Sequence, residues 1–186
     1  MEHCINPLTP KPNGLKKTKK LGLAGLTALT LASTIGVANL AGAQTVSDTL
    51  PAGLGCSFPL TYTLVGQQPV SKQWKDENGN VVRSLQAGKG TTNTLTNANT
   101  GASITLKPSG GSVSRGTLST DGTFYTYVAT GFNTLIWFPS DVPAGPATTL
   151  YIGRVVYTVD IATGTYTLVG TSGKQTDICA LLSPTP

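Results

Sequence analysis

After Gln44 the chain consists of short runs rich in Thr, Val, Tyr and Ile, which Gly, Asn, Asp and Pro interrupt at short intervals. Branched and aromatic side chains favour extended backbone, and no long stretch of this region has the helical period of about 3.6 residues. The pattern predicts an all-β domain, an antiparallel meander of about eight to ten strands that closes as a barrel or packs as a two-sheet sandwich. The many small and hydroxyl residues on these strands suit a polar outer surface.

The expected strands follow one another with short connections. They cover residues 58–65, 70–76, 81–86, 91–97, 103–107, 112–118, 123–130, 135–138, 150–159 and 165–169. Residues 177–182 fit a short helical turn or an edge strand. Residues 44–55, which contain Pro51, Gly53 and Gly55, predict a flexible lead-in, and residues 56–186 a single β-domain, which is large enough to bury a core.

The dipeptide Asn78-Gly79 predicts a hairpin, since a type I′ turn needs positive φ at both central residues. A two-residue turn places Trp74 opposite Arg83 and Lys75 opposite Val82. Trp74 then falls on the apolar face of the hairpin, in the core, with the Arg83 guanidinium beside its ring.

Residues 1–43 have the organisation of a secretory signal peptide. Four lysines between residues 16 and 20 precede an apolar run over residues 21–40, which ends in Ala41-Gly42-Ala43, the small-residue pattern that a signal peptidase requires. The alternative is a membrane anchor, because about 20 apolar residues can span a bilayer. Polar residues and glycines within the run favour the signal peptide. The sequence therefore predicts a secreted, extracellular protein that begins at Gln44 and has no membrane span after processing.

The positive charge belongs mainly to this leader. Residues 1–43 contain five lysines and one acidic residue, whereas the whole chain has a net charge of +5. The basic residues of the mature part are scattered along the sequence: Lys72, Lys75, Arg83, Lys89, Lys107, Arg115, Arg154 and Lys174. Because nucleic-acid binding needs a clustered basic face, the sequence predicts no nucleic-acid partner.

The mature part retains two cysteines, Cys56 and Cys179. An even number of cysteines in an exported chain predicts a disulfide, which here joins the two ends of the domain. The alternative is a lipid on Cys56, but Gly53 stands where a lipidation site requires a large aliphatic residue.

Several chemistries are excluded by composition. The only histidine, His3, lies in the leader, so the mature chain has neither a Ser-His-Asp triad nor a histidine zinc site. Residues 76–80 begin like a calcium loop, but Val81 and Ala87 replace the required Gly and Glu. No metal, cofactor or catalytic residue is therefore predicted.

Paired carboxylates leave one enzymatic alternative, a carboxylate-dependent glycan hydrolase. Five of the mature acidic residues lie at expected turns, where an Asp side chain bonds the local backbone. These residues are Asp76, Glu77, Asp121, Asp141 and Asp160. Their positions favour a structural role.

Half of the aromatic residues lie between positions 124 and 138. Aromatic rings offer a large contact area, and Tyr and Trp add a polar tip, which suits a glycan or a small apolar ligand. We predict Tyr125, Tyr127 and Trp137 as binding residues, with the hydrophobic core as the alternative role. Tyr125 and Tyr127 share one strand face and Phe124 points to the other.

Four segments of the mature chain are distinctive: Cys56-Ser-Phe-Pro59, Asp76-Glu-Asn-Gly-Asn-Val-Val-Arg83, Ile136-Trp-Phe-Pro-Ser-Asp-Val-Pro-Ala-Gly-Pro146 and Asp177-Ile-Cys-Ala180. In them the chain resembles a group of small secreted proteins of high-GC Gram-positive (actinobacterial) bacteria. The resemblance covers nearly all of the mature chain and implies a bacterial source and an extracellular β-rich domain, but no activity and no site residues. We therefore expect a secreted, non-enzymatic β-domain with a binding or structural role at or beyond the cell surface.

Overall fold

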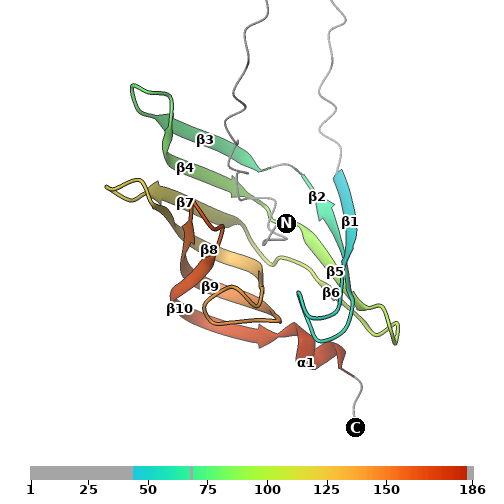
Figure 1. Ribbon diagram of the computed structural model, residues 1–186. Helices are drawn as coiled ribbons and strands as arrows, with labels where there is room; N and C mark the ends of the chain where they lie inside the picture. Colours follow the sequence, from blue (N-terminus) through green and yellow to red (C-terminus); the bar gives the residue numbers. More distant parts are fainter. Residues whose placement is uncertain (1–43, 68, 184–186) are drawn as a thin grey trace, which may run out of the picture.

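The computed structural model describes residues 44–67 and 69–183, so the predicted signal peptide lies outside the described residues. Within these residues the strands form two antiparallel sheets, which we name sheet A and sheet B (Figure 1). Sheet A has the order β1-β2-β5-β6 and sheet B the order β10-β9-β8-β7-β4-β3. The predicted all-β sandwich is confirmed. The barrel alternative is not adopted, because neither sheet closes on itself.

Sheet A contains β1 (Gln44–Leu50), β2 (Leu60–Gly66), β5 (Thr92–Asn97) and β6 (Ser103–Leu106). Sheet B contains β3 (Val70–Lys75), β4 (Val81–Gly88), β7 (Ser112–Leu118), β8 (Phe124–Trp137), β9 (Ala147–Asp160) and β10 (Tyr166–Asp177). The short helix α1 (Ile178–Leu182) follows β10. In the described part of the chain no helix has the length and apolar character that a membrane crossing requires.

The strand order departs from the predicted meander. The β3-β4 hairpin lies in sheet B, although the strands on either side of it in the sequence, β2 and β5, pair in sheet A. The β5-β6 hairpin likewise lies in sheet A between β4 and β7, which pair in sheet B. The chain therefore changes sheet after β2, β4 and β6. Turn signals predict a hairpin from its own residues, but they do not specify which sheet the hairpin joins.

The predicted flexible lead-in is wrong for its first half. Residues 44–50 form the edge strand β1, which pairs with β2 along its whole length, from Gln44 opposite Gly66 to Leu50 opposite Leu60. Only residues 51–59 form the turns that lead into β2. Alternation of side chains explains the strand, because the Leu50 side chain packs on the core while Thr45, Ser47 and Thr49 face outward.

The predicted register of the β3-β4 hairpin is confirmed from Val70 to Trp74, and it is wrong by one residue only at the turn end. Trp74 lies opposite Arg83 as predicted, but Lys75 lies opposite Val81 after a bulge. The Gly79 N–H donates to the Asp76 C=O at 3.0 Å, so the tight turn is centred one residue earlier than a type I′ turn at Asn78-Gly79. Gly79 has a φ of +83° and occupies the left-handed position that follows such a turn in a bulged hairpin.

Trp74 is not in the core, contrary to the prediction. It lies half-buried on β3, the edge strand of sheet B. The Lys72 ammonium nitrogen is 4.9 Å from the centroid of its ring, and the Arg83 guanidinium carbon is 5.2 Å from it. The predicted position of Arg83 beside the ring is confirmed. The core between the sheets takes its β8 and β9 residues from Phe132, Ile136 and Leu150, and it does not include Trp74.

The space between the two sheets is filled by an apolar core. Its innermost side chains, each at most 2% exposed, are Cys56, Leu60, Leu95, Ile136, Ile178 and Leu182. The predicted disulfide joins Cys56, ahead of β2, to Cys179 in α1. This bond and the burial of Ile178 and Leu182 hold the end of the chain against the start of the domain.

A second core lies on the opposite face of sheet B. Its buried members are Tyr127, Ala129, Leu135, Trp137, Tyr151, Val155 and Tyr157. Gly131, Gly153 and Gly173 stand in register across β8, β9 and β10, and all three have positive φ. Glycines of this kind mark a bend in a sheet, so the two halves of the long strands face each other across the second core.

Candidate functional site

The three predicted binding residues lie on one face of β8, and all three belong to the second core or pack against it. Trp137 is 2% exposed and its indole N–H donates to the Tyr151 hydroxyl at 3.1 Å. Tyr127 is 6% exposed. Tyr125 is half-buried, and its hydroxyl donates to the Val81 C=O at 2.7 Å. The structure brings Tyr125 and Tyr127 together and places Trp137 at the other end of the strand.

A row of tyrosines crosses sheet B on this face. The ring centroids of Tyr125 and Tyr127 are 6.1 Å apart, those of Tyr127 and Tyr157 5.3 Å, and those of Tyr157 and Tyr166 5.5 Å, with the last two pairs stacked. Burial, with the nearby Asp76 charge as a smaller contribution, raises the pKa of Tyr125, and burial raises the pKa of Tyr151. These interactions stabilise the bent sheet and leave Tyr127 and Trp137 little surface for a ligand.

Three of the carboxylates that were predicted to bond turns do so, those of Asp76, Asp121 and Asp160. The Asp76 carboxylate accepts from the N–H groups of Asn78 and Asn80, and Asp121 accepts from Ser119 and Thr123. Asp160 accepts from the N–H and hydroxyl of Thr163.

Hydrogen bonds to side chains and backbone lower the pKa of Asp76, Asp121 and Asp160. A glycosidase needs one carboxyl group with a raised pKa as its proton donor. None of these three carboxyl groups therefore has the raised pKa that the proton donor of a glycan hydrolase requires.

Asp141 has a different structural role, in the loop between β8 and β9. It is 3% exposed, and its carboxylate accepts from the Phe138 N–H at 2.7 Å and the Tyr166 N–H at 2.9 Å. Val142 in the same loop exchanges backbone hydrogen bonds with Tyr166 and Leu168. Asp141 thus fixes this loop against the free edge of β10. Among the described residues, no three His, Cys, Asp or Glu side chains come together as a metal site.

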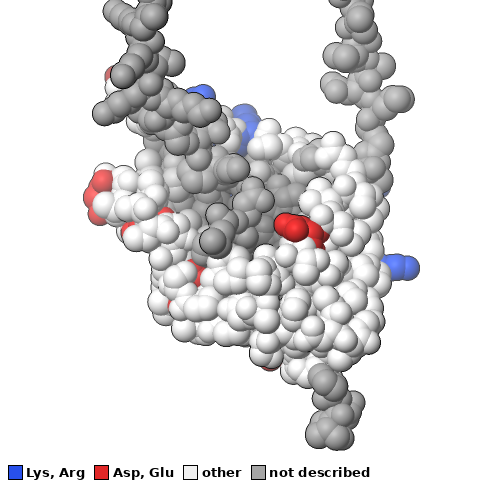
Figure 2. All heavy atoms as spheres, turned by 45° about the vertical axis from the view of Figure 1, so that its right-hand side comes forward, with Lys and Arg blue, Asp and Glu red and all other residues white. Residues whose placement is uncertain are grey.

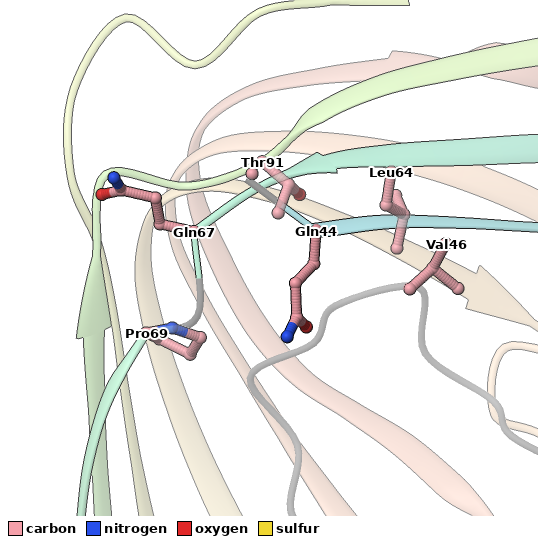
Figure 3. A pocket seen from close by; sticks show the side chains of 7 residues that line it. Gln44, Val46, Leu64, Gln67, Pro69 and Thr91 are labelled. Atoms are coloured by element: carbon pink, nitrogen blue, oxygen red, sulfur yellow. The ribbon is translucent and has the colours of Figure 1, made fainter. Parts of the chain in front are cut away.

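A small cavity lies where the chain passes between the sheets, lined by Gln44, Val46, Leu64, Gly66, Gln67, Pro69 and Thr91 (Figure 3). Its volume is about 30 Å³. Such a volume holds a water molecule or two, whereas ligand pockets have volumes of about 300–1,000 Å³. The cavity is therefore too small for an apolar ligand.

The outer face of sheet A carries a regular array of hydroxyl side chains. Register brings together ten hydroxyl side chains, which we name the hydroxyl face: Thr45, Ser47, Thr49, Thr61, Thr63, Thr92, Thr94, Thr96, Ser103 and Thr105. One row of facing residues is Thr49, Thr61, Thr96 and Ser103, and the next is Ser47, Thr63, Thr94 and Thr105. With the sheet A side turned forward, Figure 2 shows a surface with few charged side chains.

Hydroxyl groups of the hydroxyl face pair across neighbouring strands. Thr49 and Thr61 are 2.8 Å apart and Ser47 and Thr63 2.9 Å, which links β1 to β2. Similar pairs at 3.0 and 3.2 Å link β5 to β6. A hydroxyl has one donor and two acceptor sites, so the Thr49–Thr61 and Thr94–Thr105 pairs each keep one donor and three acceptor sites after their bond is made. Ser47 and Ser103 also donate to the C=O groups of Tyr62 and Leu95, so their pairs keep acceptor sites only. The surface therefore offers donors, acceptors and threonine methyl groups in a regular array.

The hydroxyl face was not predicted, although the sequence contains a pattern that indicates it. Thr and Ser alternate with apolar or amide residues in Leu60-Thr-Tyr-Thr-Leu64 and Asn93-Thr-Leu-Thr-Asn97. Alternation predicts that these hydroxyls share one face of each strand. Placing the four strands side by side required the topology, which the turn signals do not give.

No family model, curated protein or solved structure matches this chain.

Proposed function

We propose that this chain is an exported, non-enzymatic domain that binds extracellular glycan across the hydroxyl face of sheet A. The observation that carries the proposal is the hydroxyl face itself, an uncharged array of donors, acceptors and methyl groups on four adjacent strands. A sugar presents the matching chemistry, since its hydroxyls both donate and accept and its C–H groups are apolar.

The filled interior supports a surface role. Leu60, Leu95 and Ile136 occupy the space between the sheets at no more than 2% exposure, so a carrier for a small apolar ligand finds no room there. The predicted aromatic residues are committed to the second core. With the interior filled and the predicted aromatic residues packed in the second core, binding through an outer face of the domain remains.

Export is supported by the leader and by the disulfide. The basic stretch, apolar run and small-residue pattern of residues 1–43 fit a signal peptide, and a disulfide persists in oxidising compartments. The resemblance to small secreted actinobacterial proteins points to the same setting.

Co-sedimentation tests the proposal with purified residues 44–186 and three insoluble neutral polysaccharides, namely cellulose, chitin and starch. We expect the protein to bind at least one of them. The variant T63V/T94V removes two facing hydroxyls and keeps their shape, and it should weaken binding about tenfold, since each lost hydrogen bond is worth about 0.5–1.5 kcal/mol. The matched control T126V/T158V alters two facing threonines of β8 and β9 in sheet B and should bind like the wild type.

Equal binding by T63V/T94V and the wild type would refute the hydroxyl face as the contact surface. Absence of binding to all three polysaccharides would refute a neutral glycan as the partner. Release of soluble reducing sugars during the incubation would favour the hydrolase alternative instead.

A further inference from the structure

The fold gathers cations that are scattered in the sequence. Lys72, Arg83, Arg115 and Arg154 belong to four different strands of sheet B, and all four side chains are exposed. Facing residues of neighbouring strands share one side of the sheet. Arg83 faces Trp74 and Thr117, and Arg115 faces Leu85, which also faces Lys72.

The register extends this side of the sheet to Arg154. Arg115 faces Val128, which faces Val156, and Arg154 is two residues from Val156 on β9. The four cations therefore lie on the outer side of sheet B, opposite the second core. We name them the cationic stripe.

The stripe runs diagonally across the sheet. Arg115 lies on the strand next to that of Arg83 and two residues further along it, so their Cα atoms are about 8 Å apart. Arg154 lies two strands away from Arg115 and two residues further along, so their Cα atoms are about 12 Å apart. Both steps move in the same direction along the strands, so the three arginines form a line, and Lys72 lies off this line on β3, next to Arg83.

The strands that carry the stripe contribute little negative charge, and Asp76, Glu77 and Asp121 lie in the turns at the ends of these strands. Strands β3, β4, β7 and β8 contain no acidic residue. Asp160 at the end of β9 bonds Thr163 in the adjoining turn. Trp74 lies at one end of the stripe, half-buried, with the Lys72 and Arg83 cations over its ring. These cations can bind the acidic groups of a sugar chain, and the fluorescence of the adjacent indole then reports the contact.

We propose that the cationic stripe binds a linear acidic polysaccharide. This inference rests on the proposed extracellular glycan-binding role and names a second surface and a second class of glycan for it. Charge complementarity selects a polyanion, and the line of cations selects an extended one. The chain then has two glycan surfaces, a neutral one on sheet A and a cationic one on sheet B.

The spacing of the cations favours a sparsely charged polymer over a nucleic acid. A nucleic-acid strand has a phosphate about every 3.4 Å along the duplex axis, and its binding proteins present dense basic patches. Cations that are about 8–12 Å apart leave most such phosphates without a partner. A polysaccharide that has acidic groups only on some of its sugars meets the stripe without that mismatch.

Titration of purified residues 44–186 with hyaluronate, a linear polysaccharide with a carboxylate on every second sugar, tests the proposal by Trp fluorescence and calorimetry. We expect saturable binding that weakens as salt is raised. The variant R115Q/R154Q should weaken binding about tenfold, the loss expected for two exposed ion pairs. The control K89Q/K107Q makes the same change in net charge at exposed positions outside the stripe and should leave the dissociation constant within twofold. Circular dichroism should show the wild-type fold for both variants.

Equal losses in R115Q/R154Q and K89Q/K107Q would overturn the proposal, because net charge alone would then explain binding. Tighter binding of a duplex oligonucleotide, with the same sensitivity to R115Q/R154Q, would make nucleic acid the partner instead. The variant T63V/T94V should bind hyaluronate like the wild type. If the wild type binds hyaluronate but none of the three neutral polysaccharides, the proposed function fails and the cationic stripe stands. If the wild type binds a neutral polysaccharide but not hyaluronate, the cationic stripe alone fails.

Discussion

Removal of the Cys56–Cys179 disulfide by the double variant C56A/C179A should lower stability strongly and leave the fold intact. The bond closes a loop with a sequence separation of 123 residues. In the chain-entropy model a loop of this length stabilises the native state by about 5 kcal/mol, because it restricts the unfolded chain. The loss corresponds to a fall in Tm of about 15–20 °C, at about 4 °C per kcal/mol for a domain of this size.

The native state should survive because α1 has other anchors. Ile178 and Leu182 are 0% and 2% exposed, and burial of such side chains stabilises by about 1.5–3 kcal/mol each. The Asn97 side-chain amide also donates to the Leu182 C=O at 3.1 Å. Circular dichroism at 25 °C should therefore match the wild type, and the urea m-value should rise, because the unfolded chain becomes more expanded.

Thermal unfolding by calorimetry measures the effect, and wild-type protein with excess reductant serves as the matched control. Both samples should unfold at the same lowered temperature. A Tm within about 3 °C of the oxidised wild type would refute the reasoning, because the loop would then contribute little. Two titratable thiols or a lipid adduct in the native protein would show that the bond does not form.

Three further predictions follow from single features. The substitution G79V should cost about 1–2 kcal/mol, because Gly79 has a φ of +83° and open space for a side chain; G110V, also in open space and without positive φ, should unfold near the wild-type temperature in the same denaturant titration. Folding lowers the pKa of Asp121, so its carboxylate stabilises the fold fully at a pH above the pKa of the unfolded state, about 3.9, and loses this effect as the pH falls through the lower pKa of the folded state. The variant D121N should therefore flatten the acid limb of a stability–pH profile. An unchanged acid limb would disprove this role. Mass spectrometry of protein secreted by the native host should find Gln44, or its cyclised form, at the amino terminus, and the intact chain in membranes would contradict a signal peptide.

Local patterns were sufficient to predict most of the strands. The run Ser112–Leu118 was predicted with its observed bounds, and α1 was one of two alternatives given for residues 177–182. Alternating side chains and turn residues lie within a few positions of each other, so one stretch of sequence contains the whole signal. The expected strands 123–130 and 135–138 are one strand, β8, because Gly131 continues the pairing through a bend that looks like a break in the sequence.

Topology and register were harder, because they depend on residues far apart. The bulge between Trp74 and Lys75 shifts the turn end of the hairpin by one residue, which a dipeptide signal cannot anticipate. The three glycines of β8, β9 and β10 bend sheet B only because they stand in register. Burial of Tyr127 and Trp137 follows from that bend. The hydroxyl face and the cationic stripe are likewise properties of neighbouring strands and not of any one segment.

The proposed function depends on the hydroxyl face as a glycan-contact surface. The most direct test is chemical-shift mapping of labelled residues 44–186, titrated with a soluble oligosaccharide of whichever neutral polysaccharide binds. We expect shifts in the amides and methyl groups of Thr61, Thr63, Thr94 and Thr96, with the second core unaffected. Shifts centred on Tyr125, Tyr127 and Trp137, with the hydroxyl face unperturbed, would contradict it.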